Sequence, residues 1–189
     1  MHHQLATNKP RTSLRHRHRG QALVEFALLV PVLALILLSI IQVAFVFAAQ
    51  VGITNAVREA ARLGAVTTPT TTAGQATTNA TGVYNQMKGT FLPRNVFAFN
   101  AANLVEAGSP DTHVCYVSFT DTANKPAVQV TVEAQYSHRL FIPIISQILD
   151  GLDGATDGGF RVGATEQMRV ENDELPPSYG GLAQTCYNP

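Results

Sequence analysis

Glu25 is the ionisable residue whose position most constrains its chemistry. It lies in GQALVEF, residues 20–26, directly before a stretch from Ala27 to Val57 that contains no Asp, Glu, Lys or Arg. A carboxylate beside such an apolar stretch is costly unless a cation pairs with it, and an acid in this position is functional by default. Glu25 therefore marks a candidate site, although a simple interfacial charge beside a membrane span would also explain it.

The uncharged stretch after Glu25 is long enough to cross a bilayer as one helix, at about 1.5 Å per residue. Basic residues are concentrated before it, at Lys9, Arg11, Arg15, Arg17 and Arg19. By the positive-inside rule, residues 1–20 form a basic cytoplasmic leader, and the chain beyond about Arg58 lies outside the cytoplasm. A cleaved secretory signal ending near Ala48 is disfavoured, because its apolar stretch would far exceed roughly 7 to 15 residues.

The helical pattern continues beyond the span through NAVREAARLGAV, so we expect one helix from about Gln21 to Leu63, extending to residue 65. Pro31 lies within it and should kink it or remove one hydrogen bond. Small residues recur at every fourth position, at Ala44, Ala48, Gly52, Ala56, Ala60 and Gly64. This spacing lets another helix approach closely, but an Ala-rich helix without a docking role explains it equally well.

Cys115 and Cys186 are the only cysteines of the chain. Because both lie in the part expected outside the cytoplasm, their thiols can oxidise, and we predict one disulfide between them. Closing a loop of some 70 residues would stabilise the fold by roughly 4 kcal/mol in the chain-entropy model. Two separate buried thiols are the alternative.

The part beyond the helix predicts a polar linker and then a small sheet domain. Residues 66–95 are rich in Thr and include a possible helix from Ala73 to Lys88. Residues 96–189 form the predicted extracytoplasmic domain. The fold class is therefore α+β: a long N-terminal transmembrane helix that continues outside the membrane, then a small antiparallel β-sheet with short helices.

Strand patterns dominate the predicted outer domain. Apolar and polar residues alternate over Val128–Tyr136, which is the period of a half-buried strand. A strand from Val114 precedes it, and a third is expected over Phe160–Glu171, where Glu166 interrupts the apolar face. Pro143 favours a short helix between the last two strands.

Composition and motifs argue against several classes of function. The formal net charge is zero and the pI is near 7.0, which gives no electrostatic case for nucleic-acid binding. GxSxG, HExxH, CxxC, Walker and dinucleotide-binding motifs are absent, and His113 and His138 have no adjacent partners that would specify a catalytic or metal group. Asp150, Asp153 and Asp157 do not have the spacing of an EF-hand loop. We expect no catalytic, cofactor or metal site, and no enzyme.

GQALVEF together with the apolar helix resembles type IV pilin-like proteins, and most closely the TadE-like family of pseudopilins of the tight-adherence (Flp, type IVb) pilus. The resemblance is carried by RGQALVEFALLVPVLALILL and TNAVREAARLGA, over about Arg19 to Ala65. It implies that a prepilin peptidase cuts after Gly20, which makes Gln21 the new N-terminus and Glu25 the fifth residue. The new amine of a neighbouring subunit would then pair with Glu25, next to Phe26.

The function implied by this resemblance is that of a minor pseudopilin in tight-adherence pilus assembly. Major pilins of this system are very short, whereas this chain carries an external domain of over a hundred residues. Expected partners are the prepilin peptidase, other pilins or pseudopilins, the assembly platform and the bacterial cytoplasmic membrane, crossed once. The alternative is a signal-anchored binding module unrelated to pili, with an anchored hydrolase as a weaker third hypothesis.

Overall fold

The computed structural model describes residues 17–67, 73–91, 101–106, 111–142, 146–147, 151, 158–171 and 184–189. Most of the predicted leader, the position of Pro143, and Asp150, Asp153 and Asp157 lie outside these residues. The chain forms two compact units, Met1–Ile40 and Ile41–Pro189. The fold is α+β, as predicted: a long apolar helix is followed by a small antiparallel sheet and short helices.

Helix α1 runs from Arg17 to Val66 and contains Pro31. Its sequence is dominated by Leu and Ala, which favour helix, and by β-branched residues, which are tolerated where side chains pack or meet lipid. Thr67 terminates it: the Thr67 amide donates to the carbonyl of Leu63 at 3.1 Å, and the hydroxyl donates to the carbonyl of Gly64 at 2.8 Å. These bonds satisfy carbonyls that a helix end otherwise leaves unpaired.

Two shorter helical elements follow. Helix α2 spans Ala73–Gln86, which confirms the predicted helix, and a π-helical turn, η2, continues it over Met87–Phe91. A single 3₁₀ turn, η3, covers Ala101–Asn103. The buried side chains of α2 and η2 recur at helical spacing, as expected for one face on a core; they are Ala76, Ala80, Val83, Tyr84 and Met87.

The sheet has four antiparallel strands in the order β3-β2-β1-β4. The strands are β1 His113–Thr120, β2 Pro126–Arg139, β3 Gly159–Arg169 and β4 Thr185–Tyr187. The first three confirm the predicted strands, whereas β4 was not predicted. In the β1–β2 turn, Asp121 accepts hydrogen bonds from the amides of Ala123 and Lys125, both at 2.9 Å, and Asn124 has φ 57°. Asp and Asn commonly take these roles in turns.

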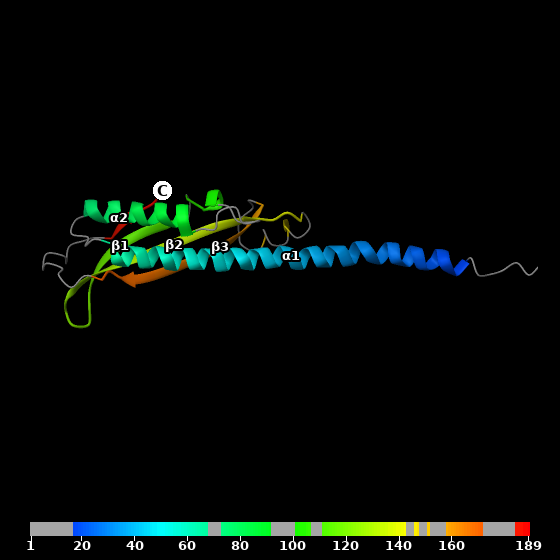
Figure 1. Cartoon of the computed structure of the whole chain (residues 1–189), viewed down its shortest axis with the longest axis horizontal. Helices are drawn as coiled ribbons and strands as arrows, with labels where there is room; N and C mark the ends of the chain where they lie inside the picture. The colour runs from blue at the N-terminus through cyan, green and yellow to red at the C-terminus, as the bar shows by residue number, and fades with distance from the viewer. Residues whose placement is uncertain are drawn as a thin grey trace, which may run out of the picture. The chain divides into compact units, whose positions relative to one another are not determined.

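The two faces of the sheet differ in chemistry. One face is apolar and almost fully buried, and on β2 it consists of Val128, Val130, Val132, Ala134 and Tyr136. Tyr187 of β4 shares this face because it pairs with Val114, and its ring lies 5.3 Å from that of Tyr84 in α2. Since Val130 also meets α1 at Gly64, the C-terminal part of α1 and helix α2 cover the same face (Figure 1). The other face carries mostly polar side chains.

Candidate functional site on the N-terminal helix

The predicted processing and pairing residues lie within two turns of α1. Gly20, Gln21, Glu25 and Phe26 are all exposed, and the ring of Phe26 is among the most exposed large side chains, at 67%. The side-chain amide of Gln21 donates a hydrogen bond to the Glu25 carboxylate at 3.0 Å. The carboxylate is therefore held on the helix surface, where a group from another chain can reach it.

Gly20 has no structural reason within the described chain to be glycine. A Cβ built at this position would have no atom within 4 Å. Glycine inside a helix costs about 1 kcal/mol relative to alanine. Neither packing within the described residues nor a positive φ therefore accounts for Gly20.

The surface after Glu25 is apolar and exposed. Every residue from 26 to 41 is exposed except Ser39, which is half-buried. In the described part of the chain, one helix is long and apolar enough to cross a membrane, and it covers Gly20–Val66. Exposed Leu, Ile and Phe side chains in such density are stable in lipid or against other apolar helices. The described part of the chain thus contains one N-terminal helix with the length and apolar surface of a membrane anchor.

The small-residue stripe is divided between two environments. Ala44 and Ala48 are exposed and Gly52 is half-buried, whereas Ala56, Ala60 and Gly64 are buried. At Gly64 a Cβ would lie 2.9 Å from Cγ2 of Val130. Gly64 therefore packs against this chain's own sheet, Ala56 and Ala60 belong to the same buried core, and Ala44 and Ala48 stay accessible to another helix.

Polar contacts fix the C-terminal part of α1 to the sheet. The Tyr116 hydroxyl donates to the Gly64 carbonyl at 3.1 Å, and burial raises the pKa of Tyr116, so the donor stays protonated. The Gln50 side-chain amide donates to the Gly163 carbonyl at 2.9 Å, and the Glu171 amide donates to the Ala65 carbonyl at 2.8 Å. These bonds set the position of the helix along the strands.

Comparison with known families agrees with this geometry. Residues 20–62 match the family model described as TadE-like protein. The N-terminal segment of this chain is TadE-like. The match covers less than half of the chain. No curated protein and no solved structure matches the chain significantly. The TadE-like match includes Gly20, Gln21, Glu25 and Phe26, and it ends before the sheet domain.

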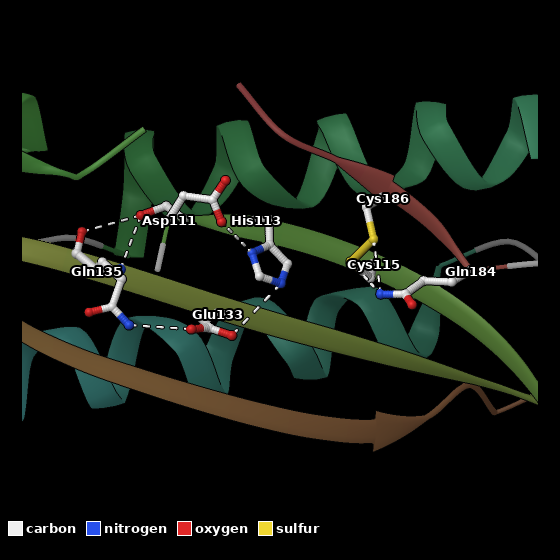
Figure 2. A network of polar contacts seen from close by, with 8 residues as sticks. Asp111, His113, Cys115, Glu133, Gln135, Gln184 and Cys186 are labelled. Carbon is white, nitrogen blue, oxygen red and sulfur yellow. Dashed lines mark hydrogen bonds and ion pairs between the residues drawn. A yellow bond between two sulfur atoms is a disulfide. The ribbon is translucent and has the colours of Figure 1, made fainter. Parts of the chain in front are cut away.

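Beyond the TadE-like segment, Cys115 and Cys186 form a disulfide (Figure 2). The two residues are register partners in β1 and β4, and the bond joins positions 71 residues apart in sequence. The side-chain amide of Gln184 lies 3.3 Å from the Cys186 sulfur and 3.6 Å from the Cys115 sulfur. The bridge therefore secures a three-residue edge strand that has little pairing of its own.

His113 has two acidic neighbours, although the described residues contain no group of three or more His, Cys, Asp or Glu side chains that could hold a metal ion. Its Nδ1 lies 2.9 Å from Asp111, and its Nε2 lies 3.8 Å from Glu133 across the strand pair (Figure 2). Gln135 donates to Glu133 at 3.3 Å. Asp111 lies only two residues away in sequence, a signal that was available. The nearby Cys115 is oxidised, so it supplies no nucleophile to this histidine.

A second polar cluster joins α2 to the chain before β1. The Tyr84 hydroxyl and the Lys88 ammonium both hydrogen-bond to the carboxylate of Glu106. The bonds from Lys88 and then Tyr84 hold the pKa of Glu106 below its usual value, whereas burial and then the Glu106 bond raise the pKa of Tyr84. This cluster connects structural elements and has no contact with the TadE-like segment among those described.

Gln42 is the polar residue of α1 that sequence reasoning overlooked. Its side chain is fully buried, and its Oε1 accepts a hydrogen bond from the backbone amide of Phe141 at 3.2 Å. The two residues are 99 positions apart, so no local pattern could reveal the contact. A glutamine within a stretch without charged residues was the available signal, because a buried amide requires a partner.

Proposed function

We propose that this chain is a minor pseudopilin-like component that takes part in assembly of a tight-adherence (type IVb) pilus. In this proposal a prepilin peptidase cuts it after Gly20. The role is structural and not enzymatic. The observation that carries the proposal is the exposed Gly20–Phe26 segment at the start of an exposed apolar helix, within the TadE-like match.

The environment of Gly20 supports processing at this position. Open space surrounds its backbone, so a peptidase can approach it. Because glycine has a low helix propensity, the backbone around the Gly20–Gln21 bond unwinds at less cost than elsewhere in α1. Cleavage converts the amide nitrogen of Gln21 into an ammonium group, while Glu25 stays one helical turn away.

Glu25 is the proposed acceptor for that ammonium group on a neighbouring subunit. Within one chain its carboxylate has the Gln21 amide as a neutral donor, and a charged donor forms the stronger bond. In apolar surroundings, the ammonium group of one subunit and the Glu25 carboxylate of its neighbour would pair only where the two groups meet directly. Such a pair fixes the position of one helix along the axis of the next. The partners of this surface are then pilins or pseudopilins and the assembly platform.

The proposed location is the bacterial cytoplasmic membrane, with the leader in the cytoplasm. Five basic residues precede the span, and the first charges after it are the mixed set Arg58, Glu59 and Arg62. The disulfide lies in the part that this orientation puts in the periplasm or outside the cell, where disulfides persist. A folded unit of this size supports the role of a minor component, and not that of the bulk subunit.

N-terminal sequencing and intact-mass measurement of the full chain after coexpression with its matching prepilin peptidase test the processing step. We expect a new N-terminus at Gln21, and loss of cleavage in Gly20→Leu. Gly82→Leu is the matched control, because Gly82 is also a helical glycine with open space around its Cβ position. An uncut wild-type chain, or equal cleavage of Gly20→Leu and wild type, would overturn the proposal.

The exchange Glu25→Gln separates pilus assembly from an anchored binding module. It keeps the shape of the side chain and removes its charge. We expect processing to continue and assembly of the pilus, counted by electron microscopy, to fall by about tenfold or more, since one charge-assisted bond contributes about 1.5–3 kcal/mol. Unchanged assembly would instead favour the signal-anchored binding module.

A further inference from the structure

The segment that follows β2 contacts α1 in the region that continues the membrane span. The backbone amide of Phe141 bonds to the buried side chain of Gln42, and the rings of Phe141 and Phe45 meet edge to face with centroids 6.0 Å apart. Ile142 is buried and Phe141 is 49% exposed. The segment Leu140–Ile142, here called the β2 exit loop, is therefore fixed beside one particular turn of α1.

Helix geometry places that turn at the outer boundary of the bilayer. The hydrocarbon core is about 30 Å thick, which about 20 helical residues cover. Counted from Ala27, where the uncharged stretch begins, this length is used up at about Val46. Phe45 and Phe47 flank that position, and Gln42 lies about one helical turn before it. The β2 exit loop is thus at the level where acyl chains give way to headgroups.

The side chains around the loop have the chemistry of such a boundary. Val43 and Phe47 on α1 are exposed, as is Phe141 itself. Arg139, the exposed last residue of β2, supplies a cation beside them. Phe side chains buried at the boundary of headgroups and acyl chains, with a basic residue nearby, are typical of segments that lie in the membrane interface. The loop pairs with the side-chain oxygen of Gln42, whereas the buried side-chain nitrogen has no hydrogen-bond partner among the described residues.

We propose that the β2 exit loop, together with Phe45 and Phe47, rests in the interfacial layer of the outer leaflet, with the lipid bilayer itself as its partner. Continuity with the membrane span selects this partner, because the loop contacts α1 where the exposed apolar surface of the anchor ends. The inference rests on the membrane anchor and not on processing or pilus assembly. Its consequence is that the sheet domain is attached to the bilayer at two points.

The absence of tryptophan from the sequence allows a direct depth measurement. Phe141→Trp introduces one such fluorophore into the full chain, reconstituted at high lipid-to-protein ratio in phosphatidylcholine vesicles with bromine on carbons 6 and 7 of one acyl chain. A ring buried about 5–10 Å into the headgroup and acyl boundary should lose about half of its emission relative to unbrominated vesicles.

Two control chains make the measurement decisive. Phe119→Trp alters another exposed phenylalanine, on β1 three residues beyond Tyr116, which contacts Gly64. Gly64 is 22 residues beyond Gln42, or about 33 Å along the helix axis, so this chain should keep its full emission. Leu33→Trp, within the span, should be quenched strongly and so reports insertion of the anchor.

The outcomes distinguish contact of the β2 exit loop with lipid from insertion of the anchor and from processing at Gly20. Quenching of Leu33→Trp without quenching of Phe141→Trp would refute contact of the loop with lipid while leaving the anchor intact. Equal quenching of Phe119→Trp and Phe141→Trp would also refute it, because the domain would then lie on the membrane without preference. Quenching of Phe141→Trp that weakens as protein density rises would show that a second copy covers the loop instead. Processing at Gly20 is measured separately and does not affect these results.

Discussion

The N-terminal and C-terminal parts of α1 are continuous in backbone but opposite in what surrounds them. From Gly20 to Ile41 nearly every side chain is exposed, whereas from Gln42 to Val66 buried residues recur at helical spacing. Each part contains a glycine with a different reason to be there: Gly20 has open space around it, and Gly64 lies against Val130 and Tyr116. The same residue type thus has open space around it at one end of the helix and close packing at the other.

One helix can thus have two sources of stability. The N-terminal part has few tertiary contacts in the described chain and depends on lipid or other helices to cover its apolar surface. The C-terminal part is a core element of the unit Ile41–Pro189 and depends on the sheet. A substitution in one part of α1 should therefore change the stability of that part and leave the other part unchanged.

The largest expected effect is that of removing the disulfide. Replacing Cys115 and Cys186 together by Ala should lower the free energy of unfolding of the sheet domain by about 4 kcal/mol, from the 71-residue separation in the chain-entropy model. Urea unfolding of the full chain in detergent micelles, followed by near-ultraviolet circular dichroism of the tyrosines, measures it. The comparison requires that cleavage after Gly20 continue at the wild-type rate, and a parallel loss of cleavage would contradict it.

The next effect comes from adding a side chain at the two glycines. At Gly64→Val the new Cβ meets Cγ2 of Val130 at 2.9 Å, so strands or helix must shift, at a cost of about 1–3 kcal/mol. Gly20→Val should cost nothing and gain a few tenths of a kcal/mol in helix propensity. The urea midpoints of the two variants measure both. Equal midpoints for Gly64→Val and Gly20→Val would break the distinction between the two parts of the helix.

A smaller effect is expected from acid at Glu106. Its folded-state pKa lies below its ordinary value of 4.5, first because of the bond from Lys88 and then that from Tyr84. A lowered pKa gives stability that is present above the ordinary value and is lost as pH falls through it towards the folded-state value. Because Lys88 and Glu106 are each 39% exposed, the loss should stay below about 1 kcal/mol.

Urea midpoints measured between pH 7 and pH 3 test this dependence. In Glu106→Gln the slope should decrease but not vanish, because the pKa of Asp121 is also lowered, first by the amide of Lys125. A wild-type chain that becomes more stable on acidification would contradict the sign. Since these groups belong to the sheet domain, helix content of the N-terminal part should not follow the titration.

The smallest effect concerns the residue that interrupts the apolar face of β3. Glu166 lies 3.8 Å from Arg58 of α1, with side chains 34% and 62% exposed. Exposed pairs of this kind contribute about 0.2–1 kcal/mol, so Glu166→Gln should shift the urea midpoint only slightly. Arg62→Gln, on the same exposed side of the helix, is the matched control. A large loss in Glu166→Gln alone would mean that this pair, and not apolar packing, holds the helix to the sheet.

Regular patterns in the sequence predicted most of the fold. The uncharged apolar stretch predicted α1, strict alternation predicted β2 and its buried face, and the presence of only two cysteines left one pairing. The strand β4 could not be predicted, because three residues, TCY, have no periodicity, and pairing with β1 and the disulfide hold them in place. Local pattern carries no information about such a tertiary constraint.

The candidate site was predictable where it depends on local sequence, and not where it depends on contacts between distant residues. Gly20, Gln21 and Glu25 lie within one short segment, and the structure shows that they are exposed together. The small-residue stripe predicted that another segment would approach closely, but it did not predict which segment. Gly64 in fact lies against Val130 of β2, which is 66 residues further along the chain. Gln42 and Phe141 likewise become neighbours only through the fold.

Continuity of α1 has a mechanical consequence. Tension applied along the C-terminal part of α1 enters the sheet domain through a helical backbone. The contacts that resist it, from Gln50 with Gly163 to Ala65 with Glu171, extend over about 22 Å of helix. A force along the helix axis acts on these hydrogen bonds as shear. All of them are loaded at the same time, and none has to break before the next is loaded. The domain can thus bear a sustained load at its attachment, with the disulfide holding the far edge of the sheet closed.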